Sequence, residues 1–342
     1  MVRSSTLLDV QVCKEMNPPI RLRKSERSAR HASSEDVANG RLITRAPFHL
    51  QATVRVLQRR PGNRVDVWDS GRYLRVLETA DSLVLVEVEN RGTIDNPHLR
   101  FAIRSGDPTI ATRLTVGHTL RKILGLDVDP RPLHRLVAAE RTLRTTALAL
   151  RGMRPPRFAA LFEAFANVVP FQQLSLDAGV AIVGRLVERF GEHLEHGGRR
   201  FHACPTARTI ARARLEALRE CGLSAGKAKS LRSLARVIES GALSEGEISG
   251  MSTKDALTTL TELPGIGPWS AGLVLLRGLG RIDVFPPGDV GAVRGLRALM
   301  GVGPRAPLDR VIKHFGDYRG YLYFCALGGS LLAKRLIQAA PE

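Results

Sequence analysis

The stretch LTELPGIGPWSAGLVLL, residues 260–276, decides how the second half of the chain folds. Apolar residues recur at helical spacing before and after it, which predicts one helix over 256–263 and another over 269–279. Only five residues separate the two helices, so the chain must reverse direction tightly between them. We therefore predict a helical hairpin over residues 256–279.

The turn of this hairpin combines glycines with prolines. Gly265 and Gly267 allow backbone angles and close approaches that a Cβ atom would prevent. Pro268 suits the first turn of a helix, where its missing N–H costs nothing. The free amide groups at that helix start favour an anion. Gly265, Ile266 and Gly267 are therefore candidates for contacting a DNA phosphate, and an ordinary connection between two helices is the alternative.

The rest of the chain falls into three regions. Residues 1–42 lack an apolar period, which favours a disordered basic arm over a transit peptide because acidic residues are present. Residues 43–125 alternate apolar and polar residues between turn signals and predict an α+β domain with a small antiparallel sheet. Residues 126–342 have helical spacing throughout and predict an all-α core of about nine short helices. The strands of the second region are expected at 48–57, 71–79, 82–90 and 98–105, followed by a helix over 111–126.

The charge and the cysteine content limit the classes of function that the chain can have. The chain has 51 Lys and Arg residues against 33 acidic ones, a net charge of +18. This excess attracts polyanions, most commonly nucleic acid, although a merely soluble Arg-rich protein is the alternative. Cys13, Cys204, Cys221 and Cys325 lack metal-site spacing and are typical of reduced thiols. Without an apolar run of transmembrane length or a signal peptide, we expect a cytoplasmic protein with no membrane contact.

The hairpin segment LPGIGPWSA resembles the helix-hairpin-helix of the base-excision DNA glycosylase superfamily. In that superfamily a Gly/Pro-rich stretch and an aspartate follow the hairpin, and here DVFPPGDVGAVRGL occupies 283–296. The segments 168–179 (VVPFQQLSLDAG) and 221–238 (CGLSAGKAKSLRSLARVI) resemble the alkylbase branch, 3-methyladenine DNA glycosylase II. Segments 57–77 and 315–328 resemble the N-terminal sheet domain and the C-terminal helix of that branch. The resemblance implies an α+β chain with a glycosylase core of helix-hairpin-helix type.

Asp289 is the candidate catalytic residue. Breaking an N-glycosidic bond gives the sugar oxocarbenium character, which a carboxylate beside C1′ can stabilise. Asp289 matches the position of the aspartate of the family, twenty residues beyond Trp269. It also stands just before a predicted helix, so a helix N-cap is the alternative reading, and both roles are compatible.

The resemblance also bears on cofactors and on the type of reaction. Bifunctional relatives carry a lysine where this chain has Trp269, so it implies a monofunctional enzyme that leaves an abasic site. We expect that no cofactor is required for catalysis. Only Cys325 lies where some relatives hold an iron–sulfur cluster, so none is expected. Hairpins of the family hold a monovalent cation, Na⁺ or K⁺, through backbone carbonyls, which here would be those of Leu263 and Ile266.

Further residues take roles from the same resemblance. Trp269 and Tyr318 occupy positions of pocket aromatics, with core packing as the alternative, and Leu273 stands where the branch has a tyrosine. Either Phe171, Gln172 or Gln173 fills the gap left by a flipped nucleotide, or the segment is plain packing. Lys227 and Lys229 contact the DNA backbone or are solvated surface lysines.

These inferences give one main expectation and two alternatives. We expect a monomeric glycosylase that flips alkylated purines of the 3-methyladenine type out of damaged double-stranded DNA and excises them. The same fold acting on uracil, hypoxanthine or an oxidised purine is one alternative. A helix-hairpin-helix module that binds DNA without catalysis is the other.

Overall fold

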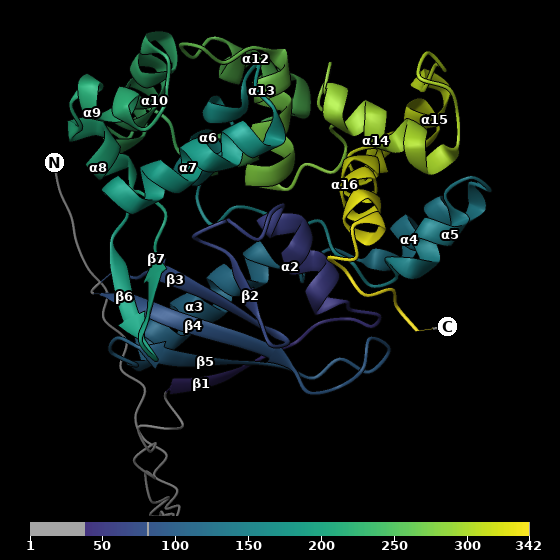
Figure 1. Ribbon diagram of the computed structural model, residues 1–342, viewed down its shortest axis with the longest axis horizontal. Helices are drawn as coiled ribbons and strands as arrows, with labels where there is room; N and C mark the ends of the chain where they lie inside the picture. Colours follow the sequence, from purple (N-terminus) through teal and green to yellow (C-terminus); the bar gives the residue numbers. More distant parts are fainter. Residues whose placement is uncertain (1–37, 81, 342) are drawn as a thin grey trace, which may run out of the picture. The chain divides into compact units, whose positions relative to one another are not determined.

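The computed structural model describes residues 38–80 and 82–341 (Figure 1). Most of the predicted basic arm, residues 1–37, lies outside this described part. The last residues of that predicted arm are not an arm, because Asn39–Leu42 form strand β1. This strand pairs with residues 99–102, so backbone pairing sets the start of the domain closer to the N-terminus than composition indicated.

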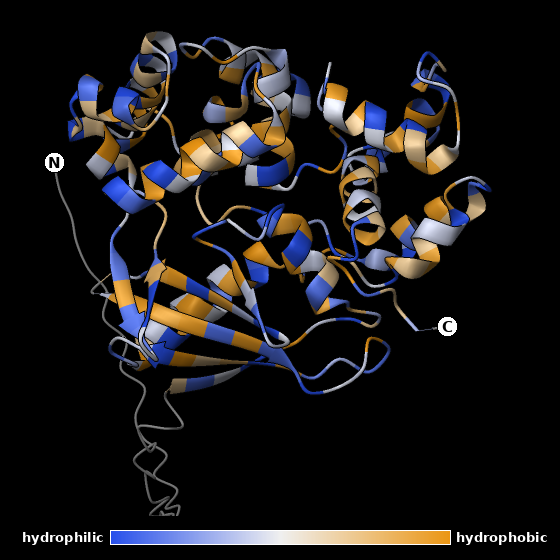
Figure 2. Cartoon of the chain, viewed as in Figure 1, coloured by the Kyte–Doolittle hydropathy of each residue, from blue (hydrophilic) through white to orange (hydrophobic). Residues whose placement is uncertain are grey.

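Five strands form one antiparallel sheet in the order β1-β5-β4-β3-β2. The predicted strands at 71–79, 82–90 and 98–105 are confirmed. Apolar residues colour most of β3 and β4 in Figure 2, because both faces of these strands are buried: one faces the main core and the other packs with Phe201 and Ala203. Strand β5 alternates buried and more exposed residues. Besides β1, the strands are β2 (Val67–Asp69), β3 (Arg72–Glu78), β4 (Leu83–Asn90) and β5 (Leu99–Ser105).

The strand predicted over 48–57 is wrong, because this segment forms helix α2, Leu50–Gln58. Its β-branched residues and apparent alternation suit a strand, yet Leu50, Val54 and Leu57 also follow helical spacing. The His49 side chain caps the helix by accepting a hydrogen bond from the Ala52 N–H. Seven of the nine helix residues are buried, and the two that are partly exposed, Gln51 and Arg55, are four residues apart, so a helical period was present beside the strand-like alternation.

The remainder of the described chain is mainly helical, with thirteen α-helices from α4 to α16 where about nine were predicted. Long periodic segments break into two, as at α8 and α9. The helices are α3 (Ile110–Ile123), α4 (Pro130–Ala139), α5 (Arg144–Ala149), α6 (Leu161–Ala166), α7 (Leu176–Phe190), α8 (Ala207–Arg212), α9 (Leu215–Glu220), α10 (Ala225–Glu239), α11 (Glu245–Gly250), α12 (Thr253–Thr261), α13 (Pro268–Val274), α14 (Val290–Met300), α15 (Asp309–His314) and α16 (Tyr321–Ala333). Shorter turns are η1 (Val169–Phe171), η2 (Leu275–Leu279, π-helical) and η3 (Gly316–Tyr318).

One β-hairpin interrupts the helical region and was not predicted. Strands β6 (His193–His196) and β7 (Arg199–His202) pair in antiparallel register. Gly197 and Gly198 form the connection, both with positive φ. A Gly-Gly pair between two short segments is a hairpin signal, so the sequence held the information in this case.

A single main core links the sheet and the helices, and it does not stop at the boundary predicted near residue 126. A buried ion-pair network crosses between them. The Arg75 guanidinium on β3 donates to Asp66 at 2.7 Å and to Glu163 on α6 at 2.5 Å. Since all three residues are at most 5% exposed, the network ties α6 firmly to the sheet.

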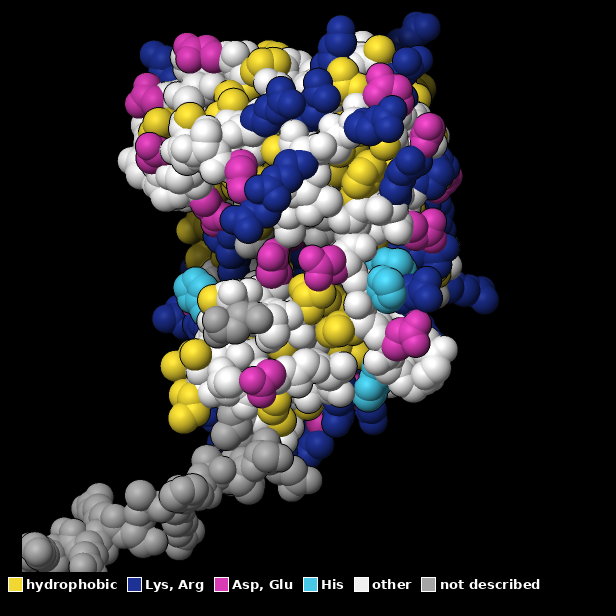
Figure 3. Space-filling view, turned by 90° about the vertical axis from the view of Figure 1, so that its left-hand side faces the viewer, with side chains coloured by type: hydrophobic (Ala, Val, Ile, Leu, Met, Phe, Trp, Pro, Cys, Tyr) yellow, Lys and Arg dark blue, Asp and Glu magenta, His cyan; other side chains and the backbone are white. Residues whose placement is uncertain are grey.

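One face of the helical part carries many basic side chains with acidic ones between them. On the face shown in Figure 3, Lys and Arg side chains are spread over the upper, helical portion. Within the described residues, no helix has the length and hydrophobicity needed to cross a bilayer.

Candidate functional site

The helical hairpin predicted from the sequence is present. Helix α12 ends at Thr261, the Ile266 N–H donates to the Leu263 carbonyl at 3.1 Å, and α13 begins at Pro268. In Figure 1 α12 and α13 lie side by side, as their contacts require. Beyond α13 the helix continues through the π-helical turn η2 and ends at Gly280 in the left-handed conformation.

The two hairpin glycines have different roles. Gly265 has φ +77°, and a Cβ atom there would lie 2.2 Å from the Ser230 Oγ atom on α10. Gly267 is the N-cap of α13, with an extended backbone (φ −93°) that any residue can adopt, and its missing Cβ faces open space. The conformational need predicted for both glycines therefore applies to Gly265 alone. The missing side chain of Gly267 leaves the backbone at the start of α13 open to solvent.

Asp289 caps the N-terminus of helix α14. Its Oδ1 atom accepts a hydrogen bond from the Ala292 N–H at 2.7 Å. Its Oδ2 atom accepts one from the Trp269 Nε1–H at 2.9 Å. The side chain is half-buried, so the carboxylate is fixed in orientation and still reaches solvent. The N-cap reading is thus confirmed, and this geometry leaves the carboxylate available for chemistry.

Close packing brings α13 against the segment that carries Asp289. A Cβ atom on Gly272 would lie 2.9 Å from the Pro287 Cδ atom, so only glycine permits this approach. Gly288, just before Asp289, has φ +72° and turns the chain into α14. The hairpin and the aspartate, separated in sequence by a Pro-Pro-Gly segment, thereby form one site.

The predicted pocket residues differ in exposure. Trp269 is half-buried and contacts the aspartate through its indole N–H, while Leu273 is 2% exposed and belongs to the core. Tyr318 is half-buried in η3. Its turn packs on the chain leading to Asp289, since the Gly320 N–H donates to the Ile282 carbonyl at 2.8 Å. Pocket roles for these residues stay predictions.

The three candidates for the wedge, the side chain that fills the gap left by a flipped nucleotide, differ in their contacts and exposure. The Phe171 ring packs against Gly179 and lies 4.8 Å from the Arg59 guanidinium carbon. The Gln172 amide donates to the Gly265 carbonyl at 2.8 Å and to the Ser270 hydroxyl at 2.9 Å. Gln173 is exposed and has φ +56°. Of the three, Gln173 is therefore the exposed side chain, and the wedge role stays a prediction.

The two lysines of α10 have different surroundings. The Lys227 ammonium donates to the carbonyls of Pro170, at 3.1 Å, and Gln172, at 2.5 Å, and burial lowers its pKa. Lys229 is exposed. Sequence reasoning did not single out Ser230 or Ser270, because their contacts join segments that are distant in the sequence.

The residues predicted for a monovalent cation are compatible with one. The Leu263 carbonyl accepts the Ile266 N–H and has a second lone pair, as a carbonyl ligand of such an ion needs. Carbonyl oxygens suit hard cations, so Na⁺ or K⁺ at the carbonyls of Leu263 and Ile266 stays a prediction. Among the described residues no group of three or more His, Cys, Asp or Glu side chains is arranged to hold a metal.

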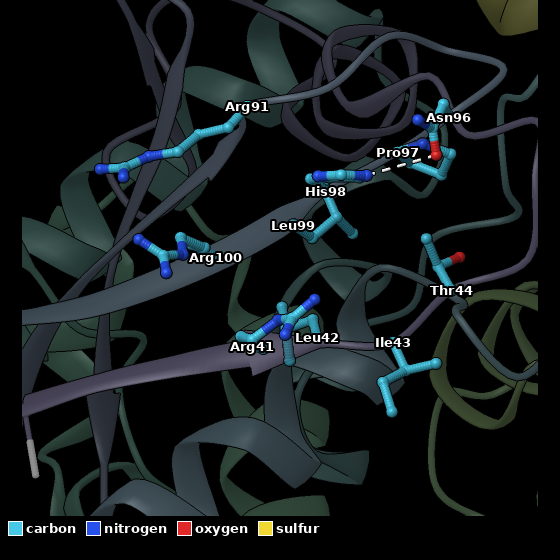
Figure 4. Close-up of a pocket in the computed structure, with 10 residues that line it drawn as sticks. All are labelled: Arg41, Leu42, Ile43, Thr44, Arg91, Asn96, Pro97, His98, Leu99 and Arg100. Carbon is cyan, nitrogen blue, oxygen red and sulfur yellow. Dashed lines mark hydrogen bonds between the residues drawn. The ribbon is translucent and has the colours of Figure 1, made fainter. Parts of the chain in front are cut away.

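A cavity of about 480 Å³ lies elsewhere, at the β1–β5 edge of the sheet (Figure 4). Arg41 on β1 stands directly opposite Arg100 on β5. Arg91 and His98 also line it, and no carboxylate does, so the cavity is cationic. It contains none of the residues predicted for the site around Asp289.

Comparison with known proteins supports this organisation. A model described as "HhH-GPD superfamily base excision DNA repair protein" matches residues 167–317, and one described as "AlkA N-terminal domain" matches residues 39–160. A solved structure, a 3-methyladenine DNA-glycosylase from Archaeoglobus fulgidus, is 27% identical with a TM-score of 0.68. That likeness covers 84% of this chain and 97% of the archaeal one.

Two curated relatives carry related names. A DNA-3-methyladenine glycosylase of Bacillus subtilis is 30% identical over 55% of this chain and 62% of its own length. A "probable bifunctional transcriptional activator/DNA repair enzyme AlkA" of Mycobacterium tuberculosis is 28% identical over 80% of this chain and 53% of its own length. The chain thus spans less than two thirds of these relatives.

The match to the HhH-GPD model contains the hairpin and Asp289, and the match to the AlkA N-terminal domain contains the five-stranded sheet. The predicted fold class, α+β with a helix-hairpin-helix core, is confirmed. The region of residues 167–317 therefore belongs to the HhH-GPD superfamily of base excision DNA repair proteins, and together with the AlkA N-terminal domain match at residues 39–160 its organisation is similar to that of 3-methyladenine DNA glycosylases.

Proposed function

We propose that this protein is a monofunctional DNA glycosylase that excises alkylated purines from double-stranded DNA and leaves an abasic site. The observation that carries the proposal is the carboxylate of Asp289, held by the Trp269 indole N–H and the Ala292 N–H next to the hairpin. Such a carboxylate is oriented before substrate binds, so no reorganisation is needed at the moment of reaction.

The reaction proceeds by loss of the base and addition of water. The bond between C1′ and the purine nitrogen breaks, and its electron pair leaves with the base. A purine alkylated at N3 or N7 is cationic and departs neutral, so no general acid is required. Asp289 stabilises the oxocarbenium ion at C1′, and a water molecule then adds there and loses a proton. The target nucleotide must first leave the stack, which a side chain such as Gln173 assists by filling the gap.

In this proposal the hairpin binds a phosphate of the DNA backbone. The open surface at Gly267 and the free amides at the start of α13 suit a phosphate of the DNA backbone. The net charge of +18 favours association with any DNA. Neither feature reads sequence, as expected of an enzyme that searches for damage.

The absence of lyase activity is part of the proposal. A Schiff-base route needs an amine beside C1′, and Trp269 stands at the position where bifunctional relatives have a lysine. We expect borohydride to trap no covalent complex with abasic DNA. A trapped complex would contradict the monofunctional assignment.

A direct experiment is incubation with methylated genomic DNA, followed by chromatography and mass spectrometry of the freed bases. Release of 3-methyladenine is expected. Release of only uracil, hypoxanthine or an oxidised purine from a panel of duplexes would assign another lesion. Tight DNA binding with no released base would favour the binding module.

Asp289→Asn tests the catalytic residue. Asparagine is also a good N-cap, so the fold and the DNA affinity should persist. The rate of base release should fall by about 100-fold or more, because the negative charge facing C1′ is lost. Asp283→Asn is the matched control, since Asp283 accepts a hydrogen bond from the Thr253 hydroxyl at 2.5 Å and should matter to release much less. Base release that survives Asp289→Asn would refute the assignment.

A further inference from the structure

The segment that carries Gln173 is held from two sides. The Lys227 ammonium donates to the carbonyls of Pro170 and Gln172, which bracket Phe171. The Gln172 side chain donates to the Gly265 carbonyl and the Ser270 hydroxyl, both in the hairpin. Gln172 is thus fixed at its backbone and at its side chain, and the next residue is the exposed Gln173.

Helix α10 contacts both the wedge segment, residues 170–173, and the hairpin. Lys227 and Ser230 are three residues apart on this helix and so lie on the same face. Lys227 holds the segment after η1, while Ser230 fills the space that the missing Cβ of Gly265 leaves. One face of α10 therefore carries the wedge segment and the hairpin together.

The backbone of Gln173 explains why such support is needed. Its φ of +56° is in the left-handed region that residues other than glycine rarely adopt. The carbonyl of Gln172 belongs to the peptide that precedes Gln173, so its orientation sets that angle. Lys227 binds this carbonyl at 2.5 Å.

We propose that Lys227 is a positioning residue that aims Gln173 at the DNA stack, with Gln172 as the strut that couples this segment to the phosphate-binding hairpin. The proposal rests on the proposed function. This role replaces the contact with the DNA backbone that was predicted for Lys227, because a DNA phosphate would compete with the two protein carbonyls that already hold the ammonium group. Lys229, exposed two residues further, suits a phosphate contact instead.

Two measurements on the full-length protein separate the roles. The first is the fluorescence of 2-aminopurine beside an abasic-site analogue in a duplex, which rises when a side chain disturbs the stack. The second is the salt dependence of binding to an undamaged duplex, which counts phosphate contacts. Single-turnover release of alkylated purine at saturating enzyme adds a catalytic readout.

Lys227→Met should lose the fluorescence response and slow single-turnover release by about tenfold to 100-fold, because the wedge is misplaced. Its salt slope should equal that of the wild type. Lys227→Arg should restore the response, since a guanidinium can donate to both carbonyls. Lys229→Met should lower the salt slope by about one. Lys313→Met, which removes an exposed charge on α15, should change none of these readouts.

The opposite pattern would overturn the proposal. If Lys227→Met lowers the salt slope by about one and keeps the fluorescence response, Lys227 is a phosphate ligand. If circular dichroism shows that Lys227→Met does not fold, Gln172→Leu decides, because it cuts the strut without removing a charge and should also lose the response. A wild-type protein that releases no alkylated purine would refute the proposed function alone, since the fluorescence and salt measurements need no base release.

Discussion

Replacing the two hairpin glycines one at a time should separate folding from DNA binding. Gly265→Ala puts a side chain on a residue with φ +77°, which costs about 1–2 kcal/mol for an L-residue. The new Cβ atom would also lie 2.2 Å from the Ser230 Oγ atom and 2.8 Å from its Cβ atom. Forcing α10 and the hairpin apart adds about 1–3 kcal/mol, a typical cost of overpacking. The expected total is about 2–5 kcal/mol of unfolding free energy.

Gly267→Ala should behave differently. Its backbone is already in a conformation that alanine adopts, and no heavy atom lies within 4 Å of the added Cβ. The loss of a favoured N-cap residue costs about 0.5–1 kcal/mol at most. The methyl group stands, however, on the surface proposed to face a phosphate. Affinity for a duplex with an abasic-site analogue should fall by about tenfold, equivalent to about 1.4 kcal/mol.

Thermal and urea denaturation followed by circular dichroism, with fluorescence anisotropy for DNA binding, would measure both effects. Gly265→Ala should lower Tm by roughly 5–10 °C, and Gly267→Ala by roughly 2 °C or less. Equal loss of stability in the two variants would refute the assigned roles of these glycines. Unchanged DNA affinity in Gly267→Ala would remove the hairpin surface from the proposed DNA contact.

Two further predictions concern stability. Glu163→Ala should lower the free energy of unfolding by about 3–5 kcal/mol in urea denaturation, because it leaves the buried Arg75 guanidinium with one carboxylate fewer. The control Glu195→Ala, which removes an exposed ion pair, should lower it by less than about 1 kcal/mol. Equal losses in the two variants would contradict this reasoning. His134 accepts the Gly152 N–H, and burial, aided by nearby guanidinium groups, lowers its pKa from 6.5 to about 4. The folded state therefore favours the neutral imidazole, so its contribution to the free energy of unfolding is complete above pH 6.5 and is lost as the pH falls from 6.5 to 4. Over that range Tm should fall in the wild type and fall less in His134→Gln. If Tm falls equally with pH in both proteins, His134 is not the group responsible.

Much of the site could be predicted from short segments. The hairpin depends on glycine and proline in a turn between two periodic runs, and each of these signals acts over a few residues. Asp289 was predictable as an N-cap for the same reason, since a cap bonds to an amide three residues later. Its catalytic role stays a proposal that comes from the family resemblance.

Where prediction failed, local patterns were compatible with two structures. Segment 48–57 satisfies strand and helix periods alike, and its β-branched residues favour a strand although Gln51 and Arg55 share one side of the helix. Residues 39–42 are a strand only because β5 offers a free edge to pair with. Neither outcome follows from neighbours along the chain.

The sequence alone determined the helical hairpin, the capped aspartate and three strands of the sheet, because these depend on spacing and turn chemistry within a few residues; the superfamily came from the resemblance of the hairpin segment to a known family. Only the tertiary structure showed that Trp269 holds Asp289, that Gln172 joins the wedge segment to the hairpin, and that Lys227 binds carbonyls of its own chain. These contacts join segments up to 98 residues apart, and packing of the whole core brings them within hydrogen-bonding distance.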